Sequence, residues 1–475
     1  MRSILCRIRW AALATIVFAV VGWPALTLQT RAEAPVADHR ASAHATTSVD
    51  PALLFDAVVD TIKSKFVDTE RLRALNWEAR ASEVRPSVVS ATTIDEAVGI
   101  IRQLLAELRL SHTELMTPDE ARYYDTLDMF SDYSQIERFS RERFWGSNPY
   151  YAGIGVFTVH VEGKYFVDGV LEGSPADKAG LKFGDEIVAV DGKPYTTIAA
   201  FRGKIGTDAE ITIRRLRGGD VTRYRVPIVP VVPSAAFADA TRSSARIIER
   251  DGLRVGYIHI WSLKESGSFH AALANLDPQL ASRTPPTAQP DPQTATLDAL
   301  IIDMRGRIGG QSAVANQILE TVSGGQRPNL EPGAKARPDA PPARSTISRR
   351  VEAAIRPFKG KSVLLVNHQT RSAGEVLAYG YKKSSIGWVF GSQTATAVVG
   401  SNAFVMPGGY LLLVPVLLLE FGGKPLEGTG VVPDIRVERP LPYADGADPV
   451  LDAALKHLAT GSGLPHPASD LGVKQ

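Results

Sequence analysis

The chain has 475 residues, of which 44% are hydrophobic and 22% are charged, a composition typical of globular proteins. This length is enough for two or three domains. The net charge is +2 and the sequence has no basic stripe, which argues against a nucleic-acid or polyanion partner.

The N-terminal segment has the pattern of an export signal. It is basic at its start, its run at 10–26 is apolar, and small residues at 32–34 fit a cleavage site. We therefore expect a signal peptide at 1–34 and a periplasmic or extracellular protein. If the leader is not cleaved, the apolar run, which is near the lower length for a membrane span, would keep the protein at the membrane.

A helical domain is predicted at 48–147, after a polar linker at 35–47. Apolar side chains recur at helical spacing over Pro51–Phe66 and again over Thr93–Leu108. The second of these helices runs into Leu110-Ser-His-Thr113, so a Ser-His pair follows it directly.

Residues 148–232 have a different pattern, that of a small β-domain. Strands are expected at 153–157 and 165–170. The next segment, Gly173-Ser-Pro-Ala-Asp-Lys-Ala-Gly-Leu181, predicts a short helix that starts at a proline and ends at a glycine. It is followed by Gly184-Asp-Glu-Ile-Val-Ala-Val-Asp-Gly192, a strand that closes in an Asp-Gly turn.

The order of these elements resembles a PDZ domain. Such domains add a peptide C-terminus as a strand to a sheet edge and hold its carboxylate with backbone N–H groups. By this resemblance, the carboxylate nest is the turn around Gly153, Ile154 and Gly155. The alternative is a small β-domain that binds nothing.

An α/β core is predicted at 233–440. A strand is expected at 254–261, and the stretches Leu297–Val322 and Ser362–Tyr381 each consist of an apolar strand, a turn and a helix. Two Pro-rich stretches without periodicity, at 281–296 and 325–345, are predicted surface insertions.

The end of the chain adds a hairpin and a helix. Two apolar runs surround Pro407-Gly-Gly, which indicates a hairpin, and Glu427-Gly-Thr-Gly-Val-Val-Pro-Asp434 is rich in turn residues. The last segment, 441–475, is predicted to hold one helix at 449–457 and a tail.

Ser372 lies where the apolar strand of the second βα unit passes into its helix. A serine at such a turn has an exposed hydroxyl and converging backbone N–H groups, which suits a nucleophile. The alternative is an ordinary helix N-cap. A nucleophilic serine also needs a base, which must itself be oriented.

His112 and His368 are the two histidines in motif-like surroundings. His368 precedes Ser372 by four residues but would have to fold back to reach the hydroxyl, so a structural role is favoured for it. Lys382 and Lys383 follow on the predicted helix and are expected to be solvated surface charges.

Several motifs in this order resemble the C-terminal processing peptidase family of serine peptidases. They are Leu-Ser-His-Thr, the PDZ-like segment, Ile-Ile-Asp-Met-Arg-Gly-x-x-Gly-Gly, Ser-Ala-Gly-Glu and Glu-Gly-x-Gly-Val-x-Pro-Asp, and they span Pro51 to Asp434. The resemblance implies a multidomain α/β protein with an N-terminal helical domain, a PDZ-like β-domain and a ββα-repeat (crotonase-like) catalytic core.

The family has two catalytic solutions. One branch, that of the tail-specific processing peptidases, uses a lysine base, but Ala397 stands at the matching position here. The other branch is similar to the tricorn core and to interphotoreceptor retinoid-binding protein. It implies a tetrad with Ser372 as nucleophile, His112 as base, Ser111 as relay and Glu427 orienting Ser111. Structural alternatives are a turn carboxylate for Glu427, a helix cap for Ser111 and a packed core residue for His112.

The same resemblance implies an oxyanion hole formed by the N–H of Ala373 and one from Gly309 or Gly310. The sequence departs from the family pattern at two places. Arg307-Ile308 replaces the usual Asn-Pro before the glycine pair, and residues 394–399 lack the usual Thr-Ala-Gly-Gly pattern.

These features predict an exported serine endopeptidase that captures polypeptide substrates by their C-termini and cleaves them through an acyl-enzyme. The alternative is a non-catalytic protein that binds peptides or apolar ligands on the same scaffold. Neither a metal nor a cofactor is expected, because no metal-ligand spacing is found. The sole cysteine, Cys6, lies in the leader, so no cysteine nucleophile or disulfide is expected in the mature chain.

Overall fold

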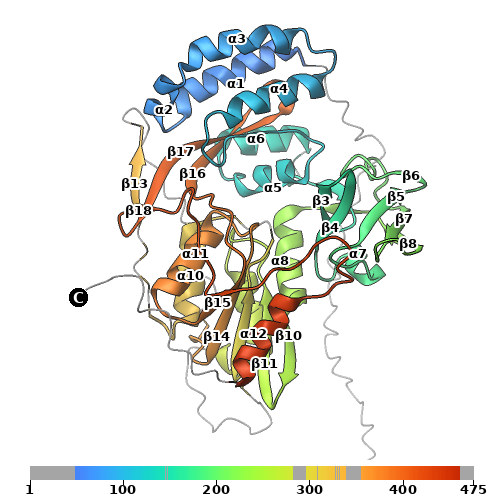
Figure 1. Ribbon diagram of the computed structural model, residues 1–475, viewed down its shortest axis with the longest axis vertical. Helices are drawn as coiled ribbons and strands as arrows, with labels where there is room; N and C mark the ends of the chain where they lie inside the picture. Colours follow the sequence, from blue (N-terminus) through green and yellow to red (C-terminus); the bar gives the residue numbers. More distant parts are fainter. Residues whose placement is uncertain are drawn as a thin grey trace, which may run out of the picture. The chain divides into compact units, whose positions relative to one another are not determined.

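The computed structural model describes residues 49–144, 146, 148–281, 296–306, 309–326, 328, 330, 332–337 and 355–460 (Figure 1). The predicted leader and linker, nearly all of the first predicted insertion, Arg307-Ile308 and the end of the tail lie outside these residues. In the described part of the chain, no helix is both long and apolar enough to span a membrane.

The first and the fourth of the N-terminal helices begin where the sequence predicts them. The helices of this region are α1 (Pro51–Lys65), α2 (Thr69–Ala74), α3 (Trp77–Val89) and α4 (Ile94–Ala106). Helix α4 starts at Thr93, whose hydroxyl accepts the N–H of Glu96 at 3.2 Å and so satisfies one of the free donors of the first turn. Its apolar stripe, which includes Ile101 and Leu105, is buried.

The core of this helical region is completed by a hairpin from the far end of the sequence. Strands β16 (Val399–Val405) and β17 (Leu411–Phe421) pair around a short 3-10 turn, η3 (Pro407–Gly409), as predicted. Leu412 and Val414 are fully buried in one cluster with the residues of α1 and α4, and the hairpin runs beside these helices in Figure 1. The helices therefore depend on an apolar surface that is encoded some 300 residues later.

The same hairpin fixes the segment that carries the Ser-His pair. Strand β1 (Glu114–Met116) begins two residues after His112 and pairs antiparallel with β17, with Glu114 opposite Leu413. Two further helices, α5 (Ala121–Met129) and α6 (Ser134–Arg143), follow β1.

The predicted β-domain has a sheet of order β3-β4-β5-β7-β8, with a short strand β6 on β5. Its elements are β3 (Val156–Val161), β4 (Lys164–Val170), α7 (Pro175–Ala179), β5 (Glu186–Val190), β6 (Lys193–Pro194), β7 (Asp208–Arg214) and β8 (Val221–Pro227). A separate pair, β2 (Tyr151–Gly153) with β9 (Val229–Val231), brackets it. Strand β3 is an edge strand, which is what peptide addition requires.

The core sheet has the order β10-β11-β12-β14-β15-β19, parallel from β11 onward. Its strands are β10 (Arg246–Arg250), β11 (Leu253–His259), β12 (Ala299–Asp303), β14 (Lys361–Val366), β15 (Trp388–Gly391) and β19 (Ile435–Arg436). The helices that accompany it are α8 (Pro233–Ser244), α9 (Gly267–Leu276), α10 (Ser312–Val322), α11 (Ala373–Lys383) and α12 (Pro449–Thr460).

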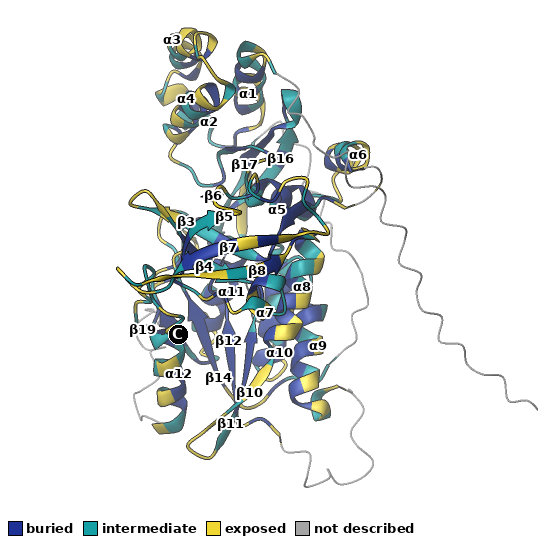
Figure 2. Cartoon of the chain, turned by 90° about the vertical axis from the view of Figure 1, so that its right-hand side faces the viewer, coloured by how far each residue is buried: buried dark blue, intermediate teal, exposed yellow. Residues whose placement is uncertain are grey.

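Both faces of this sheet are covered, so its central strands are apolar on both sides. Ile302 and Leu364 pack in one cluster with residues of α9, α10 and α11, whereas Ile301 and Val363 pack in another with α12. Figure 2 shows β12 and β14 as buried strands. The continuous apolar runs read from the sequence are explained by this arrangement, which is typical of parallel sheets. The predicted multidomain α/β architecture is confirmed.

One prediction about a loop was wrong. The stretch 325–345 was expected to be a loop, but it contains β13 (Gly333–Ala336), which pairs with β17. The strand has no apolar alternation, and all four of its residues are exposed, so its pairing comes from the free edge of β17. Other unpredicted elements include the helices α2, α3, α5, α6 and α8, the 3-10 helix η2 (Pro278–Leu280) and the strands β1, β10 and β18 (Lys424–Pro425).

Candidate active site

Ser111, His112 and Glu427 form a continuous hydrogen-bonded chain. The Ser111 hydroxyl donates to Glu427 Oε2 at 2.8 Å, and the Ser111 backbone N–H donates to Glu427 Oε1 at 2.8 Å. Ser111 Oγ also lies 2.8 Å from His112 Nδ1. The structure therefore brings together three residues from segments that are far apart in the sequence.

The hydrogen bonds among Glu427, Ser111 and His112, named here the histidine chain, fix the tautomer of the His112 imidazole. A hydroxyl has one proton to donate, and that of Ser111 is directed to the carboxylate of Glu427. Ser111 Oγ must then accept from Nδ1–H of His112, which leaves Nε2 with a free lone pair. Such a histidine can take a proton at Nε2 while the carboxylate behind it stabilises the resulting charge.

His112 is held in its neutral form by its surroundings. The side chain is buried, and burial, followed by the charges of Arg371 and Arg122, lowers its pKa well below the ordinary value of 6.5. The residue has φ = 60°, an uncommon value for a residue other than glycine.

Ser372 precedes the first turn of α11, as predicted, and its backbone is strained. It is the N-cap residue with φ = 54° and ψ = −124°, outside the well-populated regions for an L-residue. Such conformations cost on the order of 1–3 kcal/mol and occur often at functional sites. The N-cap alternative and the nucleophile hypothesis are therefore compatible, since the same turn serves both.

Glu375 holds the strained turn in place. Its carboxylate is fully buried and accepts the backbone N–H of Ser372 at 3.2 Å and that of Ala397 at 2.8 Å. It also accepts the N–H of Thr396 and the hydroxyl of Thr394, at 2.8 and 2.6 Å. Sequence reasoning gave Glu375 no role, although the spacing Ser-x-x-Glu is the signature of a capping box.

Two consecutive residues join the Ser372 turn to the histidine chain. The N–H of Ser372 donates to the carbonyl of Ala397 at 3.0 Å, and the N–H of Val398 donates to Glu427 Oε2 at 2.7 Å. The backbone of Ser372 is thus linked to the other three predicted tetrad residues through the covalently joined residues Ala397 and Val398. Among the described residues, no direct hydrogen bond joins Ser372 to His112.

The predicted oxyanion donors lie at two turns. The N–H of Ala373 is at the first position of α11, where it has no acceptor within the helix. Gly309 and Gly310 are held against Leu263, whose N–H donates to the Gly309 carbonyl at 3.0 Å. A Cβ at Gly310 (φ = 146°) would lie 2.3 Å from the Leu263 carbonyl oxygen, so this position requires glycine.

Of the local alternatives to His112, the two lysines contact other residues and His368 is exposed. Lys382 pairs with Asp434 at 2.7 Å, and Lys383 lies over the ring of Tyr379. His368 has an exposed side chain on the Asn367–Arg371 turn. Ala397, at the position of the lysine base in the other branch, is buried and offers no ionisable group.

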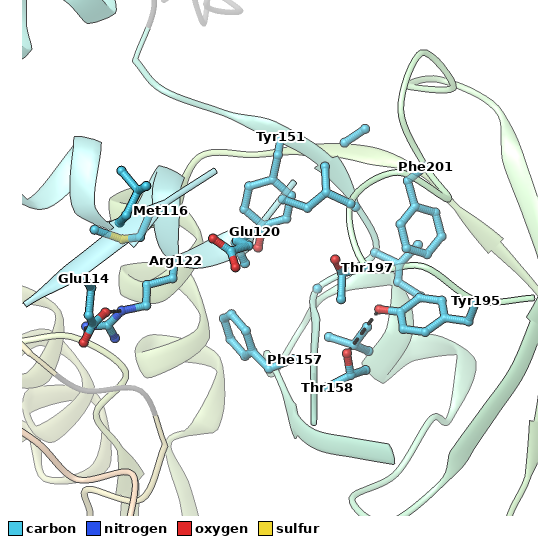
Figure 3. A pocket seen from close by; sticks show the side chains of 18 of the residues that line it. Glu114, Met116, Glu120, Arg122, Tyr151, Phe157, Thr158, Tyr195, Thr197 and Phe201 are labelled. Atoms are coloured by element: carbon cyan, nitrogen blue, oxygen red, sulfur yellow. Dashed lines mark hydrogen bonds and ion pairs between the residues drawn. The ribbon is translucent and has the colours of Figure 1, made fainter. Parts of the chain in front are cut away.

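A cavity of about 500 Å³ lies along the edge of the β-domain (Figure 3). One wall contains the predicted carboxylate nest, Gly153, Ile154 and Gly155, together with β3 residues. The opposite wall comes from the segment that follows His112 and includes Glu114 and Arg122. The groove beside the β-domain therefore ends next to the histidine chain.

Buried charges surround Asp303 and Arg305 at the end of β12, before the segment that carries the glycine pair. Arg305 bonds to Asp303 and to Asp448, and the Tyr257 hydroxyl donates to Asp303 at 2.7 Å. Burial opposes ionisation, but the charge of Arg305 outweighs it and keeps the pKa of Asp303 far below its usual range.

In the described part of the chain, no group of three His, Cys, Asp or Glu residues could hold a metal ion.

Comparisons with known proteins agree with this architecture. Residues 254–437 match peptidase family S41 and residues 166–215 match the PDZ domain family. The chain is 25% identical over 436 residues to tricorn protease homolog 2 of Streptomyces coelicolor, which covers 86% of this chain and 32% of that protein. It is 23% identical over 305 residues to the carboxy-terminal processing protease CtpB of Bacillus subtilis, covering 62% of this chain and 57% of that protein.

The chain thus spans about a third of the length of the Streptomyces protein and just over half of the length of CtpB. Among solved structures, a mutant of CPAF superposes with a TM-score of 0.51 at 11% identity, covering 86% of this chain and 97% of that chain. This likeness concerns the fold alone.

The α/β core with its PDZ domain defines a peptidase scaffold. The match of residues 254–437 to peptidase family S41, together with the PDZ match, confirms the resemblance to the C-terminal processing peptidases inferred from the motifs.

Proposed function

We propose that this protein is an exported serine endopeptidase that cleaves polypeptides through an acyl-enzyme at Ser372. The single observation that carries the proposal is the Glu427–Ser111–His112 chain, because it leaves Nε2 of His112 free to act as a base. The network through Ala397 and Val398 supports a common site for this base and Ser372.

The proposed reaction has two halves. Ser372 Oγ attacks the scissile carbonyl carbon while its proton passes to His112 Nε2, and the N–H groups of Ala373 and the Gly309–Gly310 turn stabilise the oxyanion. The C–N bond then breaks, and the proton moves from His112 to the leaving amine. A water molecule next attacks the ester, gives its proton to His112, and the proton returns to Ser372 as the new carboxylate leaves.

The PDZ groove is proposed to capture the substrate. An extended C-terminal segment would pair with the free edge of β3, and its carboxylate would reach the N–H groups at Gly153, Ile154 and Gly155. The cavity wall formed by Glu114 and Arg122 supports delivery toward His112, since both follow it closely in the sequence. Export is proposed from the leader pattern at 1–34.

A fluorophosphonate probe tests the nucleophile and its base together. We expect labelling of Ser372 in the full chain and loss of the label in His112→Ala, because the hydroxyl then has no proton acceptor. His368→Ala is the matched control and should still be labelled. Labelling of Ser372 that is indifferent to His112→Ala would overturn the assignment of the base.

A non-catalytic peptide-binding protein is the second candidate function. The observation that favours it is that no direct hydrogen bond links Ser372 to His112 among the described residues. Binding of unmodified peptides without any hydrolysis or probe labelling would support this candidate over the peptidase.

A further inference from the structure

Two arginines beside the candidate active site share one carboxylate. Arg122 makes a two-point pair with Glu114, from Nε to Oε2 at 2.5 Å and from Nη2 to Oε1 at 3.1 Å, and Arg371 Nη2 lies 3.3 Å from the same Oε1. Within the part of the chain that the structure describes, Glu114 is the only ion-pair partner of either arginine. The group of Arg122, Glu114 and Arg371, named here the arginine cluster, therefore carries one excess positive charge.

This excess charge is poorly solvated. The side chains of Arg371 and Arg122 are 18% and 28% exposed. Burial, together with the nearby charge of Arg122, lowers the pKa of Arg371 to about 10. Glu375 is also near Arg371, but its carboxylate is occupied by four hydrogen bonds from the Ser372 turn and residues 394–397. A partly buried guanidinium that shares its one carboxylate with another arginine is stabilised by a further anion.

The cluster lies where the peptide groove meets the candidate active site. Arg371 immediately precedes Ser372, and Glu114 is two residues after His112. Glu114 and Arg122 also line the groove cavity, and Figure 3 shows their paired side chains at the end of the cavity away from Tyr195 and Phe201. A chain leaving the groove toward Ser372 would thus pass the cluster.

Another arginine on the same wall shows that this arrangement is not general. Arg102 makes two bonds to Glu120, at 2.7 and 2.9 Å, and donates to the Leu115 carbonyl at 2.9 Å. Among the described residues, Glu120 pairs with no second arginine, whereas Glu114 is shared by Arg122 and Arg371. The difference singles out the arginine cluster as the place where the cavity wall lacks an anion.

We propose that Arg122 and Arg371 form a subsite that binds a carboxylate of the substrate next to the scissile bond. The planar guanidinium presents paired donors that match a carboxylate, so two converging arginines can hold it in a fixed orientation. The carboxylate belongs to an acidic side chain of the substrate, or to its C-terminus in a substrate whose C-terminus does not occupy the PDZ nest. The proposal refines the substrate preference of the peptidase proposed above and rests on that function.

The test compares matched peptides on the full-length protein. One pair differs by a free or amidated C-terminus, and a second pair differs by an internal Glu or Gln. We expect the acid form of one pair to have a kcat/KM at least about tenfold higher than its neutral form. The pair whose difference is abolished by substitution of Arg371 or of Arg122 identifies the source of the carboxylate, because the PDZ nest also favours a free C-terminus. Equal values within both pairs would overturn the proposal without any variant.

Substitutions then locate the effect. In Arg371→Gln and in Arg122→Gln, the ratio of acid to neutral kcat/KM should fall toward one, and Arg371→Lys should restore part of it. Arg202→Gln is the matched control, since Arg202 pairs with Asp119 at an exposed position, and its ratio should equal that of the unaltered protein. A ratio that is unchanged in both glutamine variants would contradict the subsite.

Binding separates this proposal from the proposed reaction. Fluorescence anisotropy of labelled peptides on Ser372→Ala measures the same preference without hydrolysis. A preference for the acid form that is lost in Ser372→Ala/Arg371→Gln would support the subsite even if no peptide is ever cleaved. Equal binding of acid and neutral peptides in both pairs would overturn the subsite and the proposed capture of the C-terminus by the PDZ groove, but it would leave the proposed chemistry at Ser372 standing.

Discussion

The two halves of the candidate active site are each organised by a glutamate, but over very different sequence distances. Glu375 holds the Ser372 turn from three residues away and contacts residues 394–397. Glu427 instead orients Ser111, which is 316 residues distant in the chain. The Ser372 turn is therefore built locally, whereas the position of His112 is set by tertiary structure. Variants at each half should affect stability and activity differently.

The largest effect is expected at the base. In His112→Ala, kcat/KM for a peptide should fall by about 10⁴ or more, because proton transfer from Ser372 has no acceptor. Steady-state kinetics measures the loss, and a thermal melt close to that of the unaltered protein would show that the fold is kept. Retention of most of the activity would mean that another group serves as base.

Next in size is the effect of Glu427→Gln. We expect a loss of about 10²–10³ in kcat, since an amide cannot stabilise the imidazolium as a carboxylate does. The N–H₂ group of the new glutamine would also face the N–H of Val398 or of Ser111, so that two donors would oppose each other where each N–H now donates to the carboxylate. The pH-rate profile separates this from a folding defect, because the acid limb should shift as the pKa of His112 changes.

Glu375→Ala should act mainly on stability. It removes a fully buried carboxylate that satisfies four donors, so we expect the free energy of unfolding to fall by about 3 kcal/mol. Urea denaturation measures the change. Glu375→Gln, which keeps part of the bonding, should cost less, and an equal cost for both would argue that the bonds are not the cause.

The smallest effect concerns pH. Burial and two arginines lower the pKa of His112, so the base stays neutral at neutral pH and kcat/KM should fall only as pH drops below 6.5. Arg371→Gln removes one of these charges, which should raise the pKa of His112 and move the acid limb to higher pH. A limb that moves to lower pH in this variant would contradict the assignment of the titrating group.

The sequence predicted the local features of the site better than the long-range ones. Ser372 follows a strand and starts a helix, and both elements are visible in the apolar pattern, so its position needed no tertiary information. The contact of Ser111 with Glu427 came only through a family resemblance. Arg371 and Glu114 were missed because a pair of charges from different segments has no signature in either segment.

The same contrast holds for the fold. The helices α1 and α4 and the strands of the core were predicted from periodicity, since each carries its own apolar pattern. Strand β13 was missed because it is exposed and owes its conformation to the edge of β17. The sharing of a core between the N-terminal helices and β17 likewise could not be read from either segment.

The place of β17 also determines when the protein can acquire its proposed base. During synthesis, residues 51–116 emerge long before Leu411–Phe421. Until β17 exists, the helices lack the part of their shared core that Leu412 and Val414 complete, and β1 has no strand to pair with. His112 therefore cannot be positioned before nearly the whole chain is made. A nascent chain therefore lacks the proposed catalytic arrangement until its synthesis is nearly complete.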